Sequence, residues 1–432
     1  MSFFAQYVEM IGYIDMKERS TMDRREFLAG LCLCCFGGAL KAAPFRVDEG
    51  TQIMNSCHAG MPEALRAHEL VQAAWTGLSP DRVWDVHAHL LGDGKSGSGC
   101  WINPHMQSIF YPEQYLQRKF IVNGACVDDG ASSLDEDYIA RLAQLIAEFP
   151  AGAGMLLFAF DHTYREDGTV DAPRAAFHVP DRHAAEIAAR FPQRFRWVAS
   201  IHPYRPDALE ALDKAVEGGA AAIKWLPSAM AIDPASARCD DFYAALANYD
   251  LPLITHAGQE RAVKGAHQQQ FGNPLRLRRP LDHGVRVVMA HCASMGRDRD
   301  LDRGRHGGEV ESFSLFERMM GEARYEGRLF ADISAMPQLN RAAHLEKIIT
   351  RPEWHGRLLN GSDYPLPGVI PLFSVDALVE KGWLKKTEGG VLKQIREYNP
   401  LMFDFVLKRS LRVAGRRLSD SIFETGAFFA KT

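Results

Sequence analysis

Val83-Trp84-Asp85-Val86-His87-Ala88-His89-Leu90 decides the fold, because an apolar run of strand length ends there on polar side chains. Seven further runs of this kind follow it, most of them roughly 30 to 40 residues apart, the repeat length of βα units in an eight-stranded barrel. They cover residues 155–160, 196–202, 221–226, 252–256, 286–291, 329–334 and 357–362.

Amphipathic stretches separate the later runs and have apolar residues at helical spacing. They cover residues 206–216, 239–249, 313–323 and 341–350. Alternation of short buried strands with helices is typical of a parallel sheet, and eight units close into a TIM (β/α)8 barrel. The sequence therefore predicts an α/β barrel over residues 83–409, followed by a C-terminal tail at 410–432.

Residues 91–154 are too many for one plain connection, so we expect an inserted cap between the first and second barrel strands. The insertion starts with a Gly/Ser-rich piece at 92–99, and it is predicted to contain a helix at 134–149 and an extra strand around 119–122. A second polar insertion at 296–308 is rich in Arg and Asp. We interpret it either as a segment that folds over the same rim of the barrel as the cap or as a solvated loop.

Composition limits the class of partner. The chain has 432 residues, 47% of them hydrophobic and 24% charged, with a formal net charge of −4. This is the balance of an ordinary globular protein, and no apolar run is long enough for a spanning helix. The absence of a large basic field argues against nucleic acid as a partner, so a small-molecule substrate is expected.

The first 43 residues differ from the rest and are interpreted as a leader, with an N-terminal extension at 44–82. Arg24 and Arg25 precede a short apolar run at 28–40, an arrangement that resembles a twin-arginine export signal. The resemblance implies the twin-arginine machinery as a partner and a periplasmic location, with a membrane tether if the signal is not cleaved. A buried helix is the alternative interpretation, and Met22 is a second candidate start.

Cysteine usage gives no disulfide prediction. Three of the eight cysteines lie in the apolar run of the leader, which leaves an odd number, five, for the folded body. No C-x-x-C pair occurs among those five, so a zinc ribbon or thioredoxin-type motif is not indicated.

Polar side chains end four of the predicted strands. His87 and His89 lie two residues apart on one strand face and can therefore bind one ion, although two hydrogen-bonded barrel histidines are the alternative. The fifth, sixth and eighth runs end near His256, His291 and Asp363. Buried ionisable groups cost stability unless they are paired or metal-bound. Their recurrence at strand ends therefore indicates a metal site at the mouth of the barrel.

These motifs resemble the amidohydrolase superfamily over roughly residues 83–405, in particular the branch that includes aminocarboxymuconate-semialdehyde decarboxylase-like enzymes. The motifs are D-V-H-A-H (85–89), I-K-W-L-P (223–227), T-H-A-G (255–258), A-H-C (290–292), G-S-D-Y-P (361–365) and the closing segment 398–403.

The resemblance implies that one divalent ion, usually zinc, is held by His87, His89, His256 and Asp363. It also implies that His291 is catalytic and that Asp363 takes a proton from the metal-bound water. A homodimer is a further expectation from the resemblance.

Lys224 ends the fourth run and has three interpretations. As a carboxylated lysine it would bridge two metals, and His291 would then be a ligand. As an ammonium beside one metal it would bind a substrate carboxylate, which is the interpretation that we favour. It could also pair with a neighbouring carboxylate.

Four further polar residues lie near predicted strand ends, and for each of them either a substrate contact or a structural role is expected. They are Asp161, His162, His202 and Asp332. Asp332 has the added interpretation that it buttresses a ligand histidine.

The sequence favours a periplasmic metal-dependent hydrolase that cleaves an ester, lactone or amide bond of a small organic molecule. The alternative enzyme class is a metal-dependent carbon–carbon lyase, a decarboxylase or hydratase acting on a small carboxylic acid. A non-catalytic metal- or ligand-binding barrel is disfavoured, because all four ligand positions and His291 are present in order.

Overall fold

The computed structural model describes residues 52–429. The predicted leader therefore lies outside the described residues, as do the start of the N-terminal extension and the end of the tail. All eight predicted strands are present, and all run parallel. They are β1 (Trp84–His89), β3 (Gly154–Phe158), β5 (Phe195–Val198), β6 (Ile223–Trp225), β7 (Leu253–His256), β8 (Val287–Ala290), β11 (Leu329–Asp332) and β12 (Leu358–Leu359).

The strands form two arcs, β1-β3-β5 and β12-β11-β8-β7-β6, which are joined on both sides. Between β5 and β6, Lys224 N–H donates to Ala199 O at 2.7 Å. Between β12 and β1, Val86 N–H donates to Asn360 O at 3.0 Å, and Asp363 N–H donates to His87 O at 2.8 Å. This is the predicted TIM barrel.

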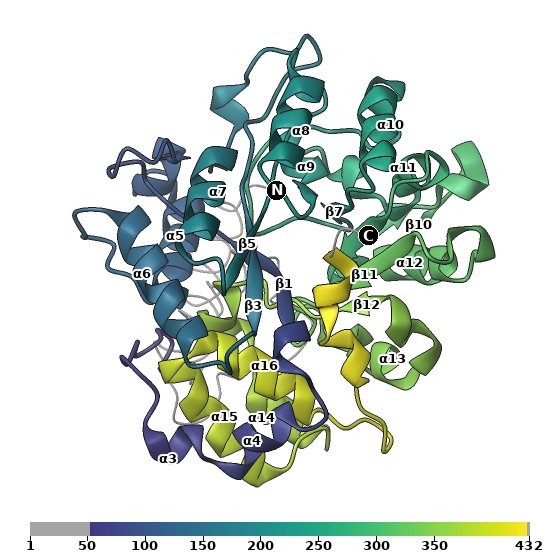
Figure 1. Cartoon of the computed structure of the whole chain (residues 1–432). Helices are drawn as coiled ribbons and strands as arrows, with labels where there is room; N and C mark the ends of the chain where they lie inside the picture. Colours follow the sequence, from purple (N-terminus) through teal and green to yellow (C-terminus); the bar gives the residue numbers. More distant parts are fainter. Residues whose placement is uncertain (1–51, 430–432) are drawn as a thin grey trace, which may run out of the picture.

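Helices surround the ring, and purple α4 packs against yellow-green α16 in the lower part of the view (Figure 1). The outer helices that follow the strands are α7 (Asp181–Arg190), α8 (Ala208–Glu217), α10 (Asp240–Asn248), α11 (Arg278–Asp282), α12 (Ser312–Met320) and α13 (Leu345–Thr350). A further group of helices that contact one another consists of α3 (Glu63–Arg66), α4 (Glu69–Trp75), α14 (Val375–Glu380), α15 (Lys386–Tyr398) and α16 (Pro400–Ser410). The four helices predicted between the later strands are confirmed, within a few residues at each end.

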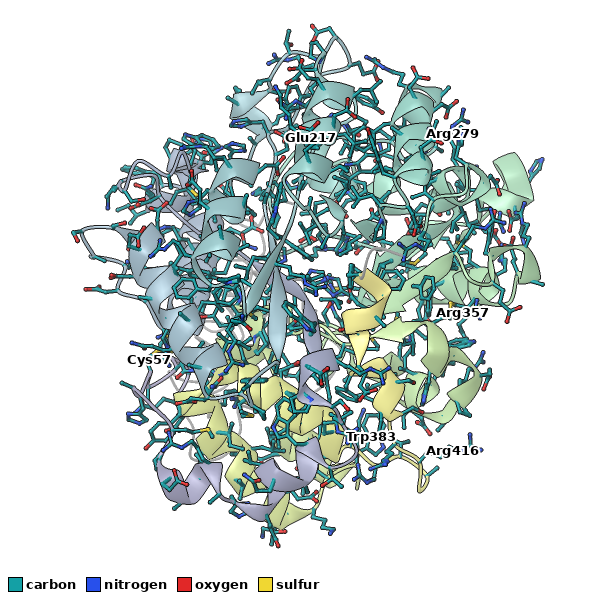
Figure 2. All side chains as sticks on the ribbon, in the orientation of Figure 1. Cys57, Glu217, Arg279, Arg357, Trp383 and Arg416 are labelled. Carbon is teal, nitrogen blue, oxygen red and sulfur yellow. A yellow bond between two sulfur atoms is a disulfide. The ribbon has the colours of Figure 1, made fainter. Side chains whose placement is uncertain are left out.

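Side chains fill the ring, and the charged residues Glu217 and Arg279 lie on the outer helices α8 and α11 (Figure 2). Val86, Leu156, Val198, Ile254 and Val288 belong to the buried cluster inside the strands. Among residues 52–429, no helix has the length and apolar character needed to cross a bilayer.

The C-terminal tail closes the bottom of the barrel. Phe429 packs in the inner cluster with Trp84, and the ring of Phe428 lies edge-on to Phe330 with centroids 4.6 Å apart. Ile422 O accepts a hydrogen bond from Asn360 N–H at 2.8 Å. The tail therefore seals the end opposite the strand C-termini, where the polar residues collect.

The cap consists of β2 (Trp101–Ile102), α5 (Pro112–Gly124) and α6 (Leu134–Ala147), and β2 pairs with β4 (Phe177–His178). The predicted helix at 134–149 is confirmed as α6, where Ser133 Oγ accepts from Glu136 N–H and acidic residues fill the first turn. The strand predicted around 119–122 is wrong, because these residues lie inside α5. That helix buries Gln117, Phe120 and Gly124 at helical spacing, so packing overrides the β-propensity of a short apolar run.

The Gly/Ser-rich piece of the cap is held by the buried carboxylate of Asp135. Its Oδ2 accepts the N–H groups of Asp93 and Gly94, each at 3.1 Å, and its Oδ1 accepts from Ser98 Oγ. A Cβ at Gly92 would lie 2.3 Å from Asp135 Oδ1, so this close approach requires glycine.

The second insertion is a hairpin of β9 (Arg297–Arg299) and β10 (Glu309–Glu311), which pair antiparallel. Its base lies against the loop after β7, since Gln259 N–H donates to Met295 O at 2.9 Å. The insertion therefore folds over the rim at the C-terminal ends of the strands, the first of the two interpretations of its sequence.

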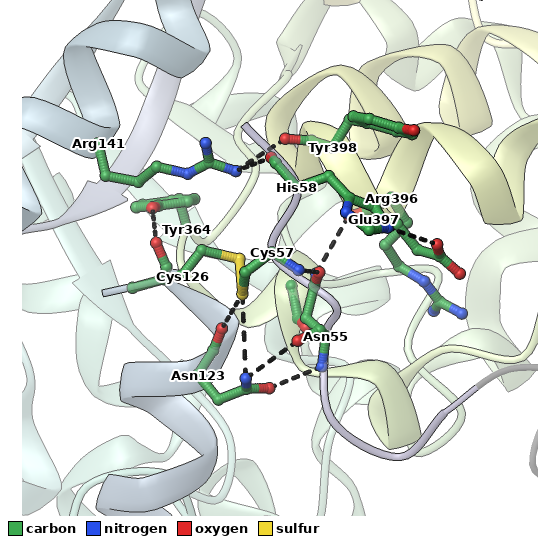
Figure 3. Close-up of a disulfide and its surroundings, with 12 residues drawn as sticks. Asn55, Cys57, His58, Asn123, Cys126, Arg141, Tyr364, Arg396, Glu397 and Tyr398 are labelled. Carbon is green, nitrogen blue, oxygen red and sulfur yellow. Dashed lines mark hydrogen bonds and ion pairs between the residues drawn. A yellow bond between two sulfur atoms is a disulfide. The ribbon is translucent and has the colours of Figure 1, made fainter. Parts of the chain in front are cut away.

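A disulfide joins Cys57 of the N-terminal extension to Cys126, two residues after α5 (Figure 3). Asn55 and Asn123 lie beside it, and Asn55 N–H donates to Asn123 Oδ1 at 2.7 Å. The disulfide uses two of the five body cysteines and leaves Cys100, Cys239 and Cys292 as buried free thiols. The extension is thereby covalently tied to the cap.

Candidate active site

His87 and His89 lie at the C-terminal end of β1, and both face the carboxylate that follows β12. His87 Nε2 lies 3.4 Å and His89 Nε2 lies 3.1 Å from Asp363 Oδ1. One ligand atom from each of these three residues falls within 4.8 Å of the other two. This spacing allows all three to bind one ion.

Tight backbone contacts bring Asp363 to this place. A Cβ at Gly361 would lie 2.5 Å from His87 Cβ, so glycine is required for the approach. Asp363 has a left-handed backbone conformation with a φ of 63°. Such conformations cost free energy in a non-glycine residue and occur mainly at functional sites that the surrounding structure holds in place.

His256 and His291 complete the centre from β7 and from the residue after β8. Their ring centroids lie 5.3 Å apart, and the ring of His291 lies 4.8 Å from that of His87. Among residues 52–429, buried His256 has no hydrogen-bond partner for either ring nitrogen, although Nε2 lies 3.1 Å from Glu260 Oε2. A buried polar atom without a hydrogen-bond partner is costly, so His256 fits a metal ligand.

A second group of possible ligand atoms overlaps the first and consists of His87, His291 and Asp332. Neither group includes His256 at this spacing. The structure thus gathers all four predicted ligands and His291, while the exact ligand set stays a prediction.

Asp332 orients two of these histidines. Its Oδ2 lies 2.9 Å from His87 Nδ1, and its Oδ1 accepts the N–H of His291 at 2.9 Å. If His87 Nδ1 is protonated and donates to this carboxylate, the lone pair of Nε2 is free for a metal. The interpretation that Asp332 buttresses a ligand histidine agrees with this geometry.

Burial keeps three imidazoles of the centre neutral, those of His87, His256 and His291. Burial together with the charge of Lys224 lowers the pKa of His87 to about 4. Burial also lowers the pKa of His256 and of His291 well below the usual value, and the charge of buried Arg341 acts in the same direction. Burial opposes ionisation of Asp363, but its histidine neighbours outweigh this effect and hold its pKa well below the usual value. Neutral imidazoles and an ionised carboxylate are the forms that bind metal.

Lys224 lies on β6 with its Nζ 3.3 Å from His87 Nε2 and 4.7 Å from the centre of the Phe158 ring. Burial lowers its pKa to about 8. Within residues 52–429 its ammonium forms no ion pair with a carboxylate, so the structure does not show the third interpretation of this residue.

The other candidate residues lie at the ends of the second and third barrel strands. Asp161 Oδ1 accepts from His162 N–H, and its Oδ2 accepts from His202 N–H, both at 2.8 Å. The ring nitrogens of His202 contact Met230 O at 2.9 Å and Tyr204 N–H at 3.2 Å, and the ring of His162 stacks on His178. The ring contacts of both histidines are thus structural, and their role in substrate binding stays a prediction.

Sequence reasoning missed three residues of the centre, which are Glu260, Ser334 and Arg341. Glu260 follows His256 by four residues, and Ser334 follows Asp332 by two, which places Ser334 on the same side of the chain. Both spacings are visible in the sequence and would have indicated that Glu260 and Ser334 lie near the centre. No sequence pattern indicated Arg341. This residue lies on a loop, and its Nη1 reaches Ser294 Oγ at 3.1 Å because of the path that the loop takes in the fold.

The barrel and its histidine and carboxylate centre define a metal-dependent enzyme. The family model described as Amidohydrolase matches residues 84–395, and the chain belongs to this family. No curated protein sequence matches the chain significantly.

Solved structures give distant likenesses. An uncharacterised TIM-barrel protein from Bordetella bronchiseptica is 14% identical with a TM-score of 0.44, over 76% of this chain and 99% of that one. A probable 2-pyrone-4,6-dicarboxylic acid hydrolase from Acinetobacter baumannii is 9% identical with a TM-score of 0.41, over 74% and 97%. A 2,6-dihydroxybenzoate decarboxylase is 13% identical with a TM-score of 0.38, over 74% and 98%. Because all three scores are low, the family assignment rests on the family match alone.

The double variant His87→Ala/His89→Ala is expected to fold and to lose its metal, because it removes two of the converging ligand atoms. Elemental analysis of the purified protein measures this, with circular dichroism as the check of folding. His162→Ala is the control, since its ring stacks on His178 outside the centre. A folded double variant with full metal content would show that these histidines are not ligands.

Proposed function

We propose that the protein is a zinc-dependent hydrolase that cleaves an ester, lactone or amide bond of a small organic molecule. The observation that carries the proposal is the convergence of His87, His89 and Asp363 beside His256 and His291, whose pKa values lie well below the usual range. Three imidazoles and one carboxylate suit zinc and leave a position for chemistry.

His87, His89, His256 and Asp363 are the residues that would hold the ion. When bound in such a site, zinc lowers the pKa of a water ligand and polarises a substrate oxygen. The four residues contribute one negative charge in total, from Asp363, so the bound ion would keep a net positive charge that favours an electron-rich substrate oxygen.

His291 is suited to proton transfer at its Nε2 atom. Its Nδ1 lies 3.1 Å from the carbonyl oxygen of Ser334 and 2.8 Å from Ser334 Oγ. Donation from Nδ1–H to the carbonyl fixes the tautomer and leaves a lone pair on Nε2. That atom lies 4.0 Å from Asp363 Oδ2, which is beyond direct hydrogen-bond reach, so either Asp363 or His291 would pass the proton to the leaving group.

We propose one metal per chain, with Lys224 as an ammonium that contacts the substrate. Support comes from the short distance between Lys224 Nζ and His87 Nε2, because the ammonium then lies beside a proposed metal ligand. A pKa of about 8 leaves this lysine largely protonated at neutral pH.

The variant Lys224→Ala is expected to keep one zinc per chain, because the lysine is not among the proposed ligands. Elemental analysis of wild type and variant measures this, and Lys214→Ala on the surface is the control. Two metals in the wild type that fall to one or none in the variant would contradict the proposal. That result would mean that Lys224 bridges two ions as a carbamate and that His291 is a ligand.

A carbon–carbon lyase is the second candidate, and the same lysine favours it. A buried ammonium beside the metal ligands is placed to bind the carboxylate of a small carboxylic acid. Incorporation of ¹⁸O from labelled water into the acid product would indicate hydrolysis, whereas release of carbon dioxide from a carboxylic acid would indicate the lyase.

The variant His291→Asn is expected to lower kcat/KM for ester or lactone hydrolysis by about 10²- to 10⁴-fold, the usual contribution of general acid–base catalysis. Its zinc content is expected to stay at the wild-type level. Steady-state rates on 4-nitrophenyl acetate and γ-butyrolactone measure this, with His283→Asn, which follows α11 and pairs with Asp240 of α10, as the control. Stoichiometric zinc without turnover of any ester, lactone, amide or carboxylic acid would instead favour a binding protein.

We further propose that the protein is exported to the periplasm by the twin-arginine machinery. The disulfide between Cys57 and Cys126 supports this, because stable disulfides are typical of oxidising compartments. Fractionation of cells that express the full chain is expected to find it outside the cytoplasm. The double variant Arg24→Lys/Arg25→Lys is expected to stay in the cytoplasm, whereas the control Arg46→Lys is exported. Equal export of both variants would contradict the proposal.

A further inference from the structure

A cavity lies between the cap and the loop after β7, and most of its lining is apolar. The apolar walls are formed by Leu91, Ile102, Met106, Ile121, Phe177 and Val263. They come from four parts of the chain: the residues just after β1, the cap, the short β4 and the loop after β7.

Both cations of the lining and one of its two side-chain amides already have partners. Lys264 Nζ lies 2.9 Å from Glu113 Oε2, and Arg118 is paired with Asp129. The side-chain amide of Gln117 donates to Arg261 O at 3.0 Å. The lining therefore offers its apolar surface to a ligand, because its cations are already neutralised by the protein.

Two routes join this cavity to the proposed metal ligands, one along the chain and one through the contacts of a carboxylate. Leu91 follows His89 by two residues, so their Cα atoms are at most about 7 Å apart. On the other wall, Glu260 Oε2 lies 3.1 Å from His256 Nε2, while Glu260 Oε1 accepts the N–H groups of Ala262 and Val263 at 2.6 and 2.8 Å. A single carboxylate thus contacts both a proposed ligand and the cavity wall.

We propose that this cavity binds an uncharged aryl or short alkyl group of the substrate, while the bond that reacts lies at the centre of His87, His89 and Asp363. The position of the reacting bond rests on the proposed function, whereas the binding of an apolar group in the cavity does not. Small-molecule sites typically combine an apolar cavity with a few polar groups at one end. The substrate is then an amphiphilic molecule with its apolar end under the cap.

Direct binding of indole to the zinc-loaded protein tests the cavity without any need for turnover. Ile121→Trp and Val263→Trp fill the cavity from opposite walls, and each is expected to weaken indole binding at least tenfold with unchanged zinc content. Both positions are only partly buried, so the larger side chain can be accommodated. Isothermal titration calorimetry measures the binding, and thermal unfolding checks the fold.

Ile109→Trp is the matched control, because it makes the same change in the same cap at a residue that is 68% exposed and outside the lining. It is expected to bind indole like the wild type. Wild-type binding of indole by both cavity-filling variants, or no binding of indole by the wild type, would overturn the inference.

A substrate series separates this inference from the proposed function. With 4-nitrophenyl acetate, butyrate and hexanoate, kcat/KM is expected to rise by about fourfold per added methylene until the cavity is full. Turnover without dependence on chain length, together with no indole binding, would overturn the cavity while the hydrolase stands. Indole binding that both filling variants abolish, without turnover of any ester, lactone or amide, would support the cavity and overturn the hydrolase.

Discussion

The buried carboxylate of Asp332 is the constraint on which the centre depends. It lies at the end of β11 and accepts hydrogen bonds from the backbone N–H of His291 and of Ser334. It also lies 2.9 Å from His87 Nδ1. Burial opposes its charge, but the neighbouring His87 and His291 hold its pKa well below the usual value. A charge that is satisfied in this way fixes the positions of both histidines.

Closure of the ring between β12 and β1 provides the second requirement. The hydrogen bond from Asp363 N–H to His87 O joins the first and last strands at the point where their side chains meet. Lys408 of α16 donates to Gly361 O at 2.6 Å and pairs with Asp404, so the last helix supports the same turn. The C-terminal part of the chain thus stabilises a site whose ligands begin near residue 87.

The cap and the N-terminal extension shape the space above this centre. The disulfide from Cys57 to Cys126 ties the extension to the segment after α5, and Tyr364 donates its hydroxyl to Ala125 O at 3.0 Å (Figure 3). Tyr364 follows Asp363 directly. The cap segment at 125–126 therefore carries the disulfide and also contacts Tyr364, the residue next to the proposed ligand Asp363. Helix α5, which ends just before this segment, forms a wall of the apolar cavity.

The sequence by itself determined the eight strands, the main helices and the residues that gather at the centre. It could do so because strand runs and strand-end polar residues are local patterns, and because parallel strands bring their C-terminal ends to one rim. The strand that the sequence predicts at 119–122 is wrong, because this short apolar run lies within a helix that is stabilised by packing. Only the tertiary structure decided that Cys57 pairs with Cys126, that Arg341 reaches Ser294, and that Leu91, Ile121 and Val263 line one cavity. The reason is physical: these contacts join segments far apart in the sequence, and nothing in their local spacing encodes the distance between them.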